Sequence, residues 1–464
     1  MSESVSSYFL FLLLLSLPAC LFPSSVRADH EGFFRNTEYN EGEFGDYVTQ
    51  SFHTTEVDAP ILNVNKPFTQ CDDGSYIFIT PRGEKAPSHP FILDHSGAMI
   101  WSAAQHYGQI YNFQVQRYRD EDYLCFWAGN DAVGGHGVGK IYMYDKHYEL
   151  YRTVVAGNGL GADLHSFVIT PNGTAVFTAY DIIELDLSSI RGARRQMGYI
   201  WDSLFQELDL ETNEVLFQWR ASEHRDLRHS YNAVNDATEY DPWDWFHINS
   251  VEKDDLGNYL VSSRYLRGVM YISGETGDVL WQLGGRANNF RDEGGSSAIS
   301  YIGQHDAHWL DEPVYHGAIT LFDNRADWAF HTEPQSRGTR VGIDVEHFTA
   351  KLDATYENEV NIISTSQGSY QSLPNGNVLI GYGFNGVISE YASDGTLLCD
   401  AYFEPSRHFT SGNVQSYRNL KFNWTGIPKA QPNLMIEDGA LYMSWMGSTQ
   451  IRKWLIQDAL TPDG

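Results

Sequence analysis

The sequence has little cysteine, and its cysteines follow no motif. Only four occur among 464 residues, with no CxxC pair and no spacing typical of a metal site. Cys20 lies in the N-terminal apolar stretch, which leaves Cys71, Cys125 and Cys399, so at most one disulfide can form. The chain is therefore not a disulfide scaffold. It must be held together by a hydrophobic core, and its length is ample for one.

Positive charge is also scarce. The chain has 31 Lys and Arg residues against 60 Asp and Glu residues, which gives a formal net charge of −29. Such a surface repels nucleic acids and anionic membranes, so we expect neither as a partner. The acidic excess indicates solubility and does not by itself indicate an activity.

Long apolar runs are missing beyond the N-terminus. One such stretch extends from Tyr8 to Phe22, is interrupted by Pro18, and is followed by Val26-Arg27-Ala28, which has the small residues of a cleavage site. It is shorter than the roughly 20 residues that a membrane-spanning helix needs. We therefore expect residues 1–28 to be a signal peptide, the mature chain to be secreted, and no membrane anchor to remain after cleavage.

Two sequons agree with that destination. Asn172-Gly173-Thr174 and Asn423-Trp424-Thr425 are N-glycosylation acceptors in a eukaryotic secretory pathway. Because the pattern is short and arises by chance, it adds only modest support for secretion. We predict glycans on Asn172 and Asn423.

Helical periodicity is hard to find, and short β-rich runs separated by Gly, Asp and Asn turns dominate. A tight turn followed by a strand recurs, with turn glycines at Gly74, Gly173, Gly257, Gly376 and Gly439. A second turn and an apolar strand follow most copies, and that strand often ends in tryptophan, as at Trp101, Trp219 and Trp281. Two hairpins per copy make a four-stranded blade. We predict an all-β fold, a six-bladed β-propeller of four-stranded antiparallel blades, with seven blades as the alternative.

The repeat indicates one domain with one insertion. No linker rich in Pro, Gly or Ser divides the chain, so we expect residues 29–464 to form a single β-propeller domain. The longest gap between turn copies holds a segment of about residues 188–244, which is rich in charged and aromatic side chains. We interpret this segment as blade-edge loops that form a lid at one end of the central channel.

Each blade of a propeller places its innermost strand along the channel, so the residues that open this strand converge on the axis. Three blades have a histidine at about the same position of the repeat: His165, His247 and His305. A single histidine that opens a strand is most often a satisfied polar residue, but three in register indicate a binding site. Arg264 lies at the far end of the hairpin that starts at His247, where it either returns to the same mouth or forms an outer salt bridge.

Metal and cofactor chemistry finds no supporting motif. Three histidines could bind zinc, yet neither HxxxH nor HExxH occurs. A quinone-cofactor dehydrogenase would also be a tryptophan-rich propeller, but such enzymes typically carry a vicinal cysteine pair, which this sequence lacks. We expect no metal and no cofactor. The expected partner is a small aromatic molecule, because aromatic residues make up 14% of the chain and suit a pocket for such a ligand.

The same strings resemble the arylsulfotransferase family, specifically its fungal arylsulfotransferase-like branch. The segments that carry the resemblance span about residues 160–420 and include Asp163-Leu164-His165, Phe246-His247-Ile248-Asn249-Ser250, Gly257-Asn258-Tyr259-Leu260, Trp281-Gln282-Leu283-Gly284-Gly285, Gln304-His305-Asp306-Ala307, Leu373-Pro374-Asn375-Gly376 and Ser416-Tyr417-Arg418. The resemblance implies a six-bladed propeller with its site in the channel.

The resemblance also implies roles for particular residues. In the bacterial sulfotransferases of this family a histidine is transiently sulfurylated, without a nucleotide sulfate donor, and His305 looks like that histidine. The residues that look like the groups around it, which stabilise the sulfuryl oxygens and activate the phenol, are His165, His247, Asn249 and Arg264. An imidazole is a competent nucleophile, and Arg together with protonated His offsets developing negative charge.

The fungal branch also includes hetero-Diels–Alderases, which join a tropolone-derived quinone methide to a polyene terpene and so give meroterpenoids. That reaction needs no nucleophile and no cofactor, only a shaped apolar cavity and donors that polarise a carbonyl oxygen. Two departures from the bacterial pattern favour it. Residues 272–304 contain no cysteine where the bacterial enzymes have a disulfide, and Ser166 follows His165 where the family pattern suggests Glu.

We therefore expect a secreted enzyme of fungal secondary metabolism that acts on phenolic or tropolone-type small molecules. Cycloaddition is the favoured reaction, nucleotide-independent sulfuryl transfer through a histidine is the alternative, and a non-catalytic binding propeller is a third interpretation. The residues expected to form the site are His165, His247, Asn249, Arg264 and His305.

Overall fold

The structure is a computed structural model that describes residues 11–12, 32–103, 107–132, 135–295, 298–311, 316–327, 335–456 and 458–459. The expected signal peptide, residues 1–28, lies outside the described residues except for β1 (Phe11–Leu12), which pairs with β34 (Asp458–Ala459). Within the described ranges no helix is both long and apolar enough to cross a membrane.

Six units of four antiparallel strands contain most of the described strands. Blade 1 consists of β31 (Leu420–Phe422), β6 (Tyr76–Ile79), β7 (Phe91–Leu93) and β8 (Met99–Ser102). Blade 2 consists of β9 (Gln109–Tyr118), β10 (Glu121–Asn130), β11 (Val138–Tyr144) and β12 (Leu150–Val154). Blade 3 consists of β13 (Ala162–Ile169), β14 (Thr174–Asp186), β15 (Met197–Asp209) and β16 (Val215–Arg220).

The other three blades follow in chain order. Blade 4 consists of β18 (Ile248–Lys253), β19 (Tyr259–Ser263), β20 (Gly268–Ile272) and β21 (Val279–Gly284). Blade 5 consists of β23 (His305–Asp311), β24 (His316–Asp323), β25 (Arg337–Asp344) and β26 (Thr349–Tyr356). Blade 6 consists of β27 (Ser369–Ser372), β28 (Val378–Gly381), β29 (Val387–Tyr391) and β30 (Leu397–Tyr402).

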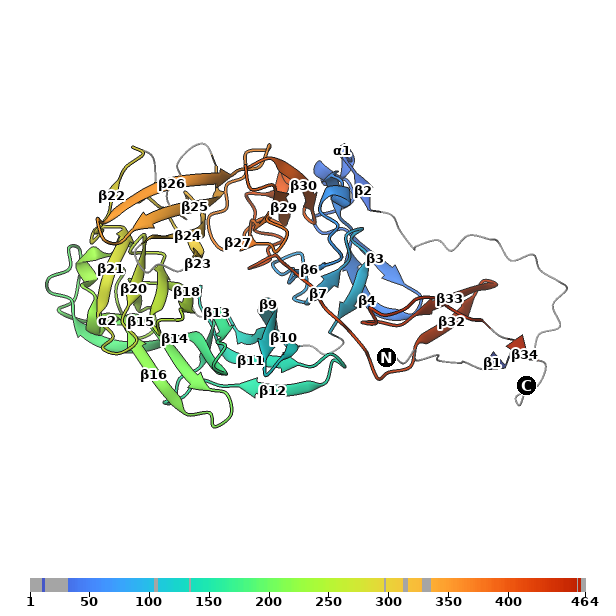
Figure 1. Cartoon of the computed structure of the whole chain (residues 1–464), viewed down its shortest axis with the longest axis horizontal. Helices are drawn as coiled ribbons and strands as arrows, with labels where there is room; N and C mark the ends of the chain where they lie inside the picture. The colour runs from blue at the N-terminus through green and yellow to red at the C-terminus, as the bar shows by residue number, and fades with distance from the viewer. Residues whose placement is uncertain are drawn as a thin grey trace.

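The innermost strands form a closed ring. Each of β31, β9, β13, β18, β23 and β27 contacts the next, and β27 contacts β31 again. Figure 1 shows the blades around a common axis. The described strands therefore form a six-bladed β-propeller, as the repeat predicts.

The hydrophobic core lies between the blades rather than at the axis. The described residues form six buried clusters, one for each pair of neighbouring blades. Aromatic rings dominate these contacts: Phe205 and Tyr259 join blades 3 and 4 with ring centroids 4.7 Å apart, and Tyr356 and Tyr370 join blades 5 and 6 at 5.6 Å. Large rings fill the wide gap between twisted sheets, which accounts for much of the aromatic content of the chain.

Several elements lie outside the blades. Near the N-terminus these are β2 (Phe33–Phe34), α1 (Thr37–Asn40), β3 (Thr49–Phe52), β4 (Thr55–Pro60), β5 (Asn63–Lys66) and η1 (Phe68–Gln70). Later ones are α2 (Ala221–His224), η2 (Leu227–His229), β17 (Trp243–Asp244), β22 (Arg291–Asp292), η3 (Ser406–His408), β32 (Asn433–Glu437) and β33 (Ala440–Ser444). Strands β5 and β2 extend the sheet of blade 6.

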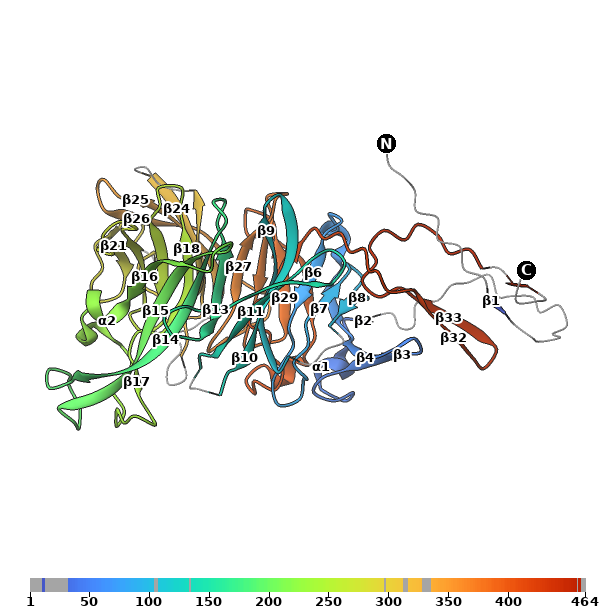
Figure 2. The same ribbon diagram turned by 90° about the horizontal axis from the view of Figure 1, so that it is seen from below.

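The turn at Gly439 is not part of a blade, although the repeat predicted it. It joins β32 to β33, and among the described strands these two pair only with each other. This hairpin instead contacts the turn of the β3–β4 hairpin, where the His53 ring stacks on Tyr442 at 3.6 Å, away from the blades (Figures 1 and 2). A tight glycine turn has the same sequence pattern inside and outside a blade, so the pattern alone does not separate the two.

The segment expected as an insertion, residues 188–244, contains two blade strands. Residues 197–209 and 215–220 are β15 and β16, and the long β14–β15 ladder extends beyond its blade (Figure 2). The parts outside blade strands are the turn at 187–196 and the stretch at 221–247. The latter stretch leads directly into the innermost strand of blade 4.

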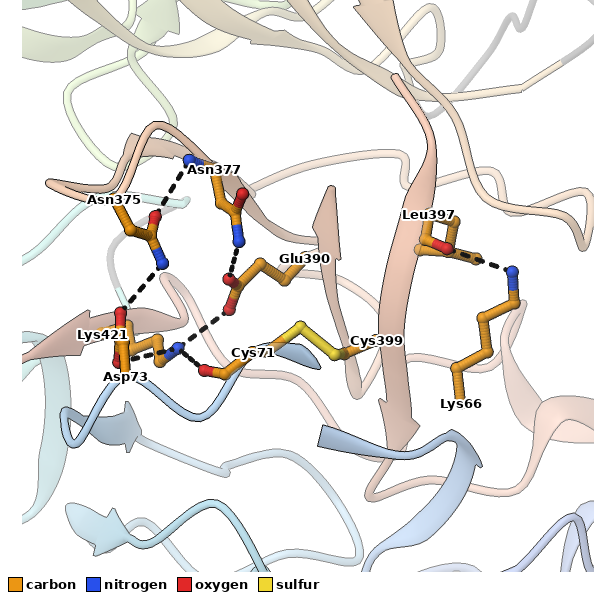
Figure 3. The surroundings of a disulfide bond; sticks show 9 residues. All are labelled: Lys66, Cys71, Asp73, Asn375, Asn377, Glu390, Leu397, Cys399 and Lys421. Atoms are coloured by element: carbon orange, nitrogen blue, oxygen red, sulfur yellow. Dashed lines mark hydrogen bonds and ion pairs between the residues drawn. A yellow bond between two sulfur atoms is a disulfide. The ribbon is translucent and has the colours of Figure 1, made fainter. Parts of the chain in front are cut away.

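The ring closes where a strand from late in the chain pairs with a strand from early in the chain. Strand β31 pairs with β6, so blade 1 takes its innermost strand from residues far along the chain. Lys421 in β31 is buried and forms salt bridges with Glu390 at 3.0 Å and Asp73 at 3.2 Å. Its ammonium group also donates to the carbonyl oxygen of Cys71 (Figure 3).

A disulfide reinforces the same junction. Cys71, just before β6, is bonded to Cys399 in β30, and Cys125 is a buried free thiol. Of the pairings that the sequence left open, the structure therefore contains the one that ties blade 1 to blade 6. The bond closes a sequence separation of 328 residues, so it restricts the unfolded chain strongly.

We predict that Cys71→Ser/Cys399→Ser lowers the free energy of unfolding by about 2–5 kcal/mol, because the unfolded chain regains the entropy of an open loop. Denaturant titration of the purified mature protein measures the change. As a control, a reductant is expected to destabilise the wild type to the same level and to leave the double variant unchanged. Equal stability of the oxidised wild type and the variant would contradict the prediction.

Candidate functional site

The first residues of the innermost strands converge because all six blades share one strand order around the ring. Most of these strands open with an irregularity: the ladder registers shift near the starts of β9, β13, β18 and β23. The backbone φ is positive, between 54° and 65°, at Asn112, His247, Asp306 and Gln367. Non-glycine residues rarely adopt this conformation, which costs on the order of 1 kcal/mol or more each. A bulge breaks the alternation of the pleat and redirects side chains, here toward the axis.

His165 is held by a buried carboxylate on its own strand. Its Nδ1 lies 2.7 Å from Oδ2 of Asp163, and the same oxygen accepts from the hydroxyl of Thr178 at 2.8 Å. The other oxygen of Asp163 accepts from the backbone N–H of Gly137 at 2.8 Å. Burial opposes the charge on Asp163, but His165 and these donors outweigh it and hold the pKa of the carboxyl well below its usual range. The side chain of His165 is thereby fixed with Nδ1 engaged and Nε2 free to face the axis.

His247 forms a similar pair with a different origin. Its Nδ1 hydrogen bonds to Oδ2 of Asp244, a residue of β17 in the stretch that precedes blade 4. Burial raises the pKa of Asp244 to about 6 and lowers the pKa of His247 well below its usual value. At neutral pH the pair is therefore a neutral imidazole that donates to a carboxylate. The rings of His165 and His247 meet edge to face, with centroids 4.9 Å apart.

His305 has no acidic partner among the described residues and is held by an amide. Its Nδ1 lies 2.8 Å from Oδ1 of Asn324, while Nδ2 of Asn324 donates to the carbonyl oxygens of Ser364 and Gln367, each at 2.9 Å. Because the amide of Asn324 is oriented by those two acceptors, its oxygen faces His305, and Nδ1 of His305 carries the proton. Nε2 consequently has a lone pair, which accepts a hydrogen bond from the backbone N–H of Gln367 at 3.2 Å. Burial, with the charge of Arg264 adding to it, lowers the pKa of His305 well below its usual value.

Arg264 lies beside His247, which is one of the two positions that the sequence left open. Its backbone N–H donates to the carbonyl oxygen of His247 at 2.9 Å. The guanidinium is buried and donates from Nη2 to the carbonyl oxygen of Thr365 at 2.7 Å. It makes no salt bridge with any described residue, and its Nε has no hydrogen-bond partner among them. A buried, uncompensated guanidinium is costly unless it binds an anion, so Arg264 is suited to an anionic group at the axis.

Asn249 is fully buried and spans two blades. Its Nδ2 donates to the carbonyl oxygen of Gln304 at 2.6 Å, directly before His305. Its backbone oxygen accepts from Nη2 of Arg418 at 3.2 Å. These contacts make Asn249 a residue that positions His305, while its Oδ1 has no partner among the described residues.

The structure thus brings His165, His247, His305 and Arg264 close together, while Asn249 contacts the backbone directly before His305. Tyr417 connects the histidines: its ring centroid lies 5.6 Å from that of His165 and 6.4 Å from that of His305. The phenol oxygen of Tyr417 has no hydrogen-bond partner among the described residues. We call His165, His247, His305, Arg264 and Tyr417 the axial cluster.

His136 is a functional candidate that the repeat did not reveal. It comes from the loop between β10 and β11, stacks on Tyr180 at 4.1 Å and lies 6.4 Å from the His247 ring. It is fully buried, and neither ring nitrogen has a partner among the described residues. Burial lowers the pKa of His136 to about 4. The glycine next to His136 was the signal in the sequence that could have drawn attention to this loop. Gly137 has no room for a side chain, because a Cβ there would lie 2.5 Å from the ring of Trp127.

A second missed group is an ion network next to the axial cluster. Oδ1 of Asp306 lies 3.0 Å from Nη2 of Arg418 and 2.9 Å from Nε2 of His308, and Oδ2 accepts from the backbone N–H of Tyr370 at 3.0 Å. Every oxygen of this carboxylate is therefore satisfied. We assign the network to structure rather than to chemistry.

No three His, Cys, Asp or Glu side chains of the described residues are placed to hold a metal ion. The axial cluster instead has a donor suited to an anion, the Nε of Arg264, which has no partner among the described residues. Residues 114–404, more than half of the chain, match the model of the family described as arylsulfotransferase (ASST). The chain belongs to the arylsulfotransferase (ASST) family. The matched range of this ASST member includes all five predicted site residues.

Other comparisons add less. No curated protein matches this ASST member. Among solved structures it is similar to a protein of unknown function from Bacteroides caccae, with 12% identity, a TM-score of 0.43, and coverage of 75% of this chain and 98% of that one. It is also similar to Kuenenia stuttgartiensis hydrazine synthase, with 11% identity, a TM-score of 0.38, and coverage of 80% and 98%. The Dos1 propeller has 9% identity, a TM-score of 0.36, and coverage of 75% and 69%.

We predict that His305 stays neutral as the pH falls from 8 to about 5.5, because burial and Arg264 both disfavour its cation and lower its pKa below the usual value of about 6.5. Nitrogen-detected NMR of the histidine-labelled protein measures this, with the His305 signal identified as the one lost in His305→Gln. Exposed His347, whose pKa is raised by its hydrogen bond to Asp344, serves as the internal control that does titrate. A His305 midpoint at or above about 6.5 would overturn the assignment.

Proposed function

We propose that this ASST family member transfers a sulfuryl group between phenolic small molecules through His305. One observation carries the proposal: His305 is a buried, neutral imidazole whose Nδ1–H is held by Asn324, so that Nε2 has the lone pair of a nucleophile. Thiols, amines and imidazoles attack as their neutral or anionic forms, so a lowered pKa keeps the nucleophile available at physiological pH. The family match supports the same chemistry.

In the first half-reaction, Nε2 of His305 attacks the sulfur of an aryl sulfate. The N–S bond forms while the S–O(aryl) bond breaks, and the phenolate oxygen takes a proton from Nε2 of protonated His165. Asp163 accepts a hydrogen bond from Nδ1 of His165 and so orients the ring for this proton transfer. The Gln367 N–H, 3.2 Å from Nε2, gives up its hydrogen bond as the N–S bond forms.

In the second half-reaction, an acceptor phenol gives its proton to the now neutral His165. The oxygen of this phenol attacks the sulfur on His305. The new S–O bond forms, the N–S bond breaks, and the electron pair returns to Nε2 of His305. Arg264 is suited to both half-reactions, because its unpartnered Nε can donate to the sulfuryl oxygens. His247, neutral at physiological pH, is suited to orient the phenol by a hydrogen bond.

A second candidate is cofactor-free hetero-Diels–Alder cycloaddition of a tropolone-derived quinone methide with a polyene terpene. The observation that favours it is the Gln367 N–H on Nε2, which engages the lone pair that sulfuryl transfer requires. In that reaction Arg264 polarises the carbonyl oxygen of the quinone methide, and no covalent intermediate forms. His305 then acts only by packing and orientation.

We further propose that the protein is secreted, as the N-terminal stretch suggests. The Cys71–Cys399 disulfide supports this, because disulfides persist in oxidising compartments. Both sequon asparagines support it too: Asn172 and Asn423 are exposed, so an oligosaccharide on either would meet solvent.

We predict that incubation with 4-nitrophenyl sulfate and no added acceptor adds one sulfuryl group to His305, because no added phenol then takes the sulfuryl group from the histidine. Intact-mass and peptide mass spectrometry measure the addition. His305→Asn should abolish the label and lower transfer to a phenol on the order of 10³-fold or more, whereas the exposed control His347→Asn should retain both. Absence of label together with full product formation from quinone methide and terpene in His305→Asn would favour cycloaddition instead.

We predict that the protein expressed in a yeast secretory host leaves the cell beginning at Asp29 and carries two N-glycans. Amino-terminal sequencing and the mobility shift on deglycosylation measure this. Asn172→Gln and Asn423→Gln should each remove one step of the shift, since each removes one acceptor. Retention of all the protein inside the cell would contradict secretion.

A further inference from the structure

A group of arginines lies at the surface directly beside the axial cluster. The stretch that follows η2 passes over blade 4, where the backbone N–H of Tyr231 donates to the carbonyl oxygen of Tyr265 at 2.8 Å. The ring of Tyr265 lies 5.2 Å from the ring of His247. Asn232 donates to the carbonyl oxygen of Asp244, the partner of His247, at 2.8 Å. The surface at Tyr231 is therefore one residue layer away from the axial cluster.

Two guanidinium groups lie against the ring of Tyr231. The Cζ of Arg267 is 4.4 Å from the ring centroid and the Cζ of Arg286 is 4.6 Å away. Arg286 also donates to the backbone oxygen of Arg228 at 3.3 Å, so Arg228 in η2 lies beside Arg286. The fourth member is Arg225, which donates to the side chain of Gln282. We call Arg225, Arg228, Arg267 and Arg286 the arginine rim.

The rim is positive on a protein that is strongly negative. Arg228 pairs with Asp226 at 2.8 Å and Arg267 with Asp327 at 3.2 Å. Among the described residues, neither Arg225 nor Arg286 has an acidic side chain within salt-bridge distance. Four guanidinium groups against two carboxylates leave an excess of positive charge here, although the whole chain carries −29.

His229 lies among these arginines, and their positive charge affects its pKa. Burial lowers its pKa, and Arg225, Arg228 and Arg286 lower it further against the opposing effect of Asp226. The Nδ1 of His229 and the Nε of Arg225 are buried and have no hydrogen-bond partner among the described residues. The rim therefore has unused donors as well as unbalanced charge.

The stacking geometry fits recognition of an oxyanion. A guanidinium that lies over an aromatic ring uses its face for that contact and keeps the N–H groups of its edge for hydrogen bonds. Arg286 is exposed and Tyr231 is 39% exposed, so the edge of the Arg286 guanidinium is accessible to solvent. Exposed arginines beside a site also raise the local concentration of anions by long-range attraction.

We propose that the arginine rim is a capture site for an aromatic substrate bearing an oxyanion, such as a sulfate ester, which it binds before the anionic group reaches Arg264. This rests on the proposed function for the substrate's sulfate, but binding at the rim does not depend on chemistry at His305. Because the net charge of −29 disfavours the approach of an anion, a local positive surface beside the axial cluster attracts such a substrate toward it.

The test measures binding separately from turnover. In a His305→Asn background, which cannot be sulfurylated at that position, calorimetry compares 4-nitrophenyl sulfate with the neutral isostere 4-nitroanisole and with inorganic sulfate. The rim variant is Arg228→Gln/Arg286→Gln. The matched control is Arg194→Gln/Arg291→Gln, which removes two exposed arginines outside the rim, paired with Asp236 and Glu293, and has the same change in charge.

The rim variant is expected to bind 4-nitrophenyl sulfate about fivefold or more weakly than its parent, with 4-nitroanisole unaffected and the control variant close to its parent. Inorganic sulfate should bind more weakly than the aryl sulfate to every protein. Equal affinities of the rim and control variants for 4-nitrophenyl sulfate would overturn the proposal. Equal affinity of the rim for inorganic sulfate and aryl sulfate would overturn the aromatic part of it. Failure to label His305 in the wild type would reject sulfuryl transfer and leave these binding results standing.

Discussion

Everything at the axis depends on the pairing of β31 with β6, which closes the ring. An open array of blades would leave the first residues of the innermost strands on separate edges, and histidines far apart in sequence would not meet. Closure is reinforced where it is weakest, at the junction of blades 1 and 6, by the buried ammonium of Lys421 and by the Cys71–Cys399 bond. A short strand such as β31 contributes few ladder hydrogen bonds of its own, so this junction needs side-chain and covalent support.

Burial at the axis separates structural charges from reactive groups. Asp306 is surrounded by Arg418, His308 and a backbone donor. Burial disfavours the charged form of His308, but Asp306 and Glu252 outweigh it and raise the pKa of His308 to about 10. That network remains ionised and rigid. Among the described residues His305 is held by the amide of Asn324 and faces the positive charge of Arg264, so the same burial leaves it neutral. Charge compensation, rather than residue type, therefore decides which histidine can act as a nucleophile and which holds blades together.

Much of this was readable from the sequence, and what was not has a physical reason. Turn glycines and strand lengths predict the blades, because each blade is a local unit of two hairpins. The position of His165, His247 and His305 follows from that repeat. The acid partner Asp244 and the loop histidine His136 do not, because both lie outside the blade strands and reach the histidines only in the folded structure. Asp163 lies in β13, but its pairing with His165 is seen only in the structure. The residues with positive φ near the starts of the innermost strands are not glycines, so the sequence gives no sign of this backbone conformation.

The two candidate reactions differ at a single atom of this site. Both need donors on an oxygen that gains negative charge, and Arg264 supplies them in either case. Only sulfuryl transfer also needs the lone pair on Nε2 of His305, and the Gln367 N–H that occupies it comes from a residue with a left-handed backbone. A small rotation at Gln367 would free or block the nucleophile without disturbing any blade. A fold built for sulfuryl transfer can therefore host a reaction with no covalent intermediate through a local backbone change, while the ring, the donors and the approach to the axis stay as they are.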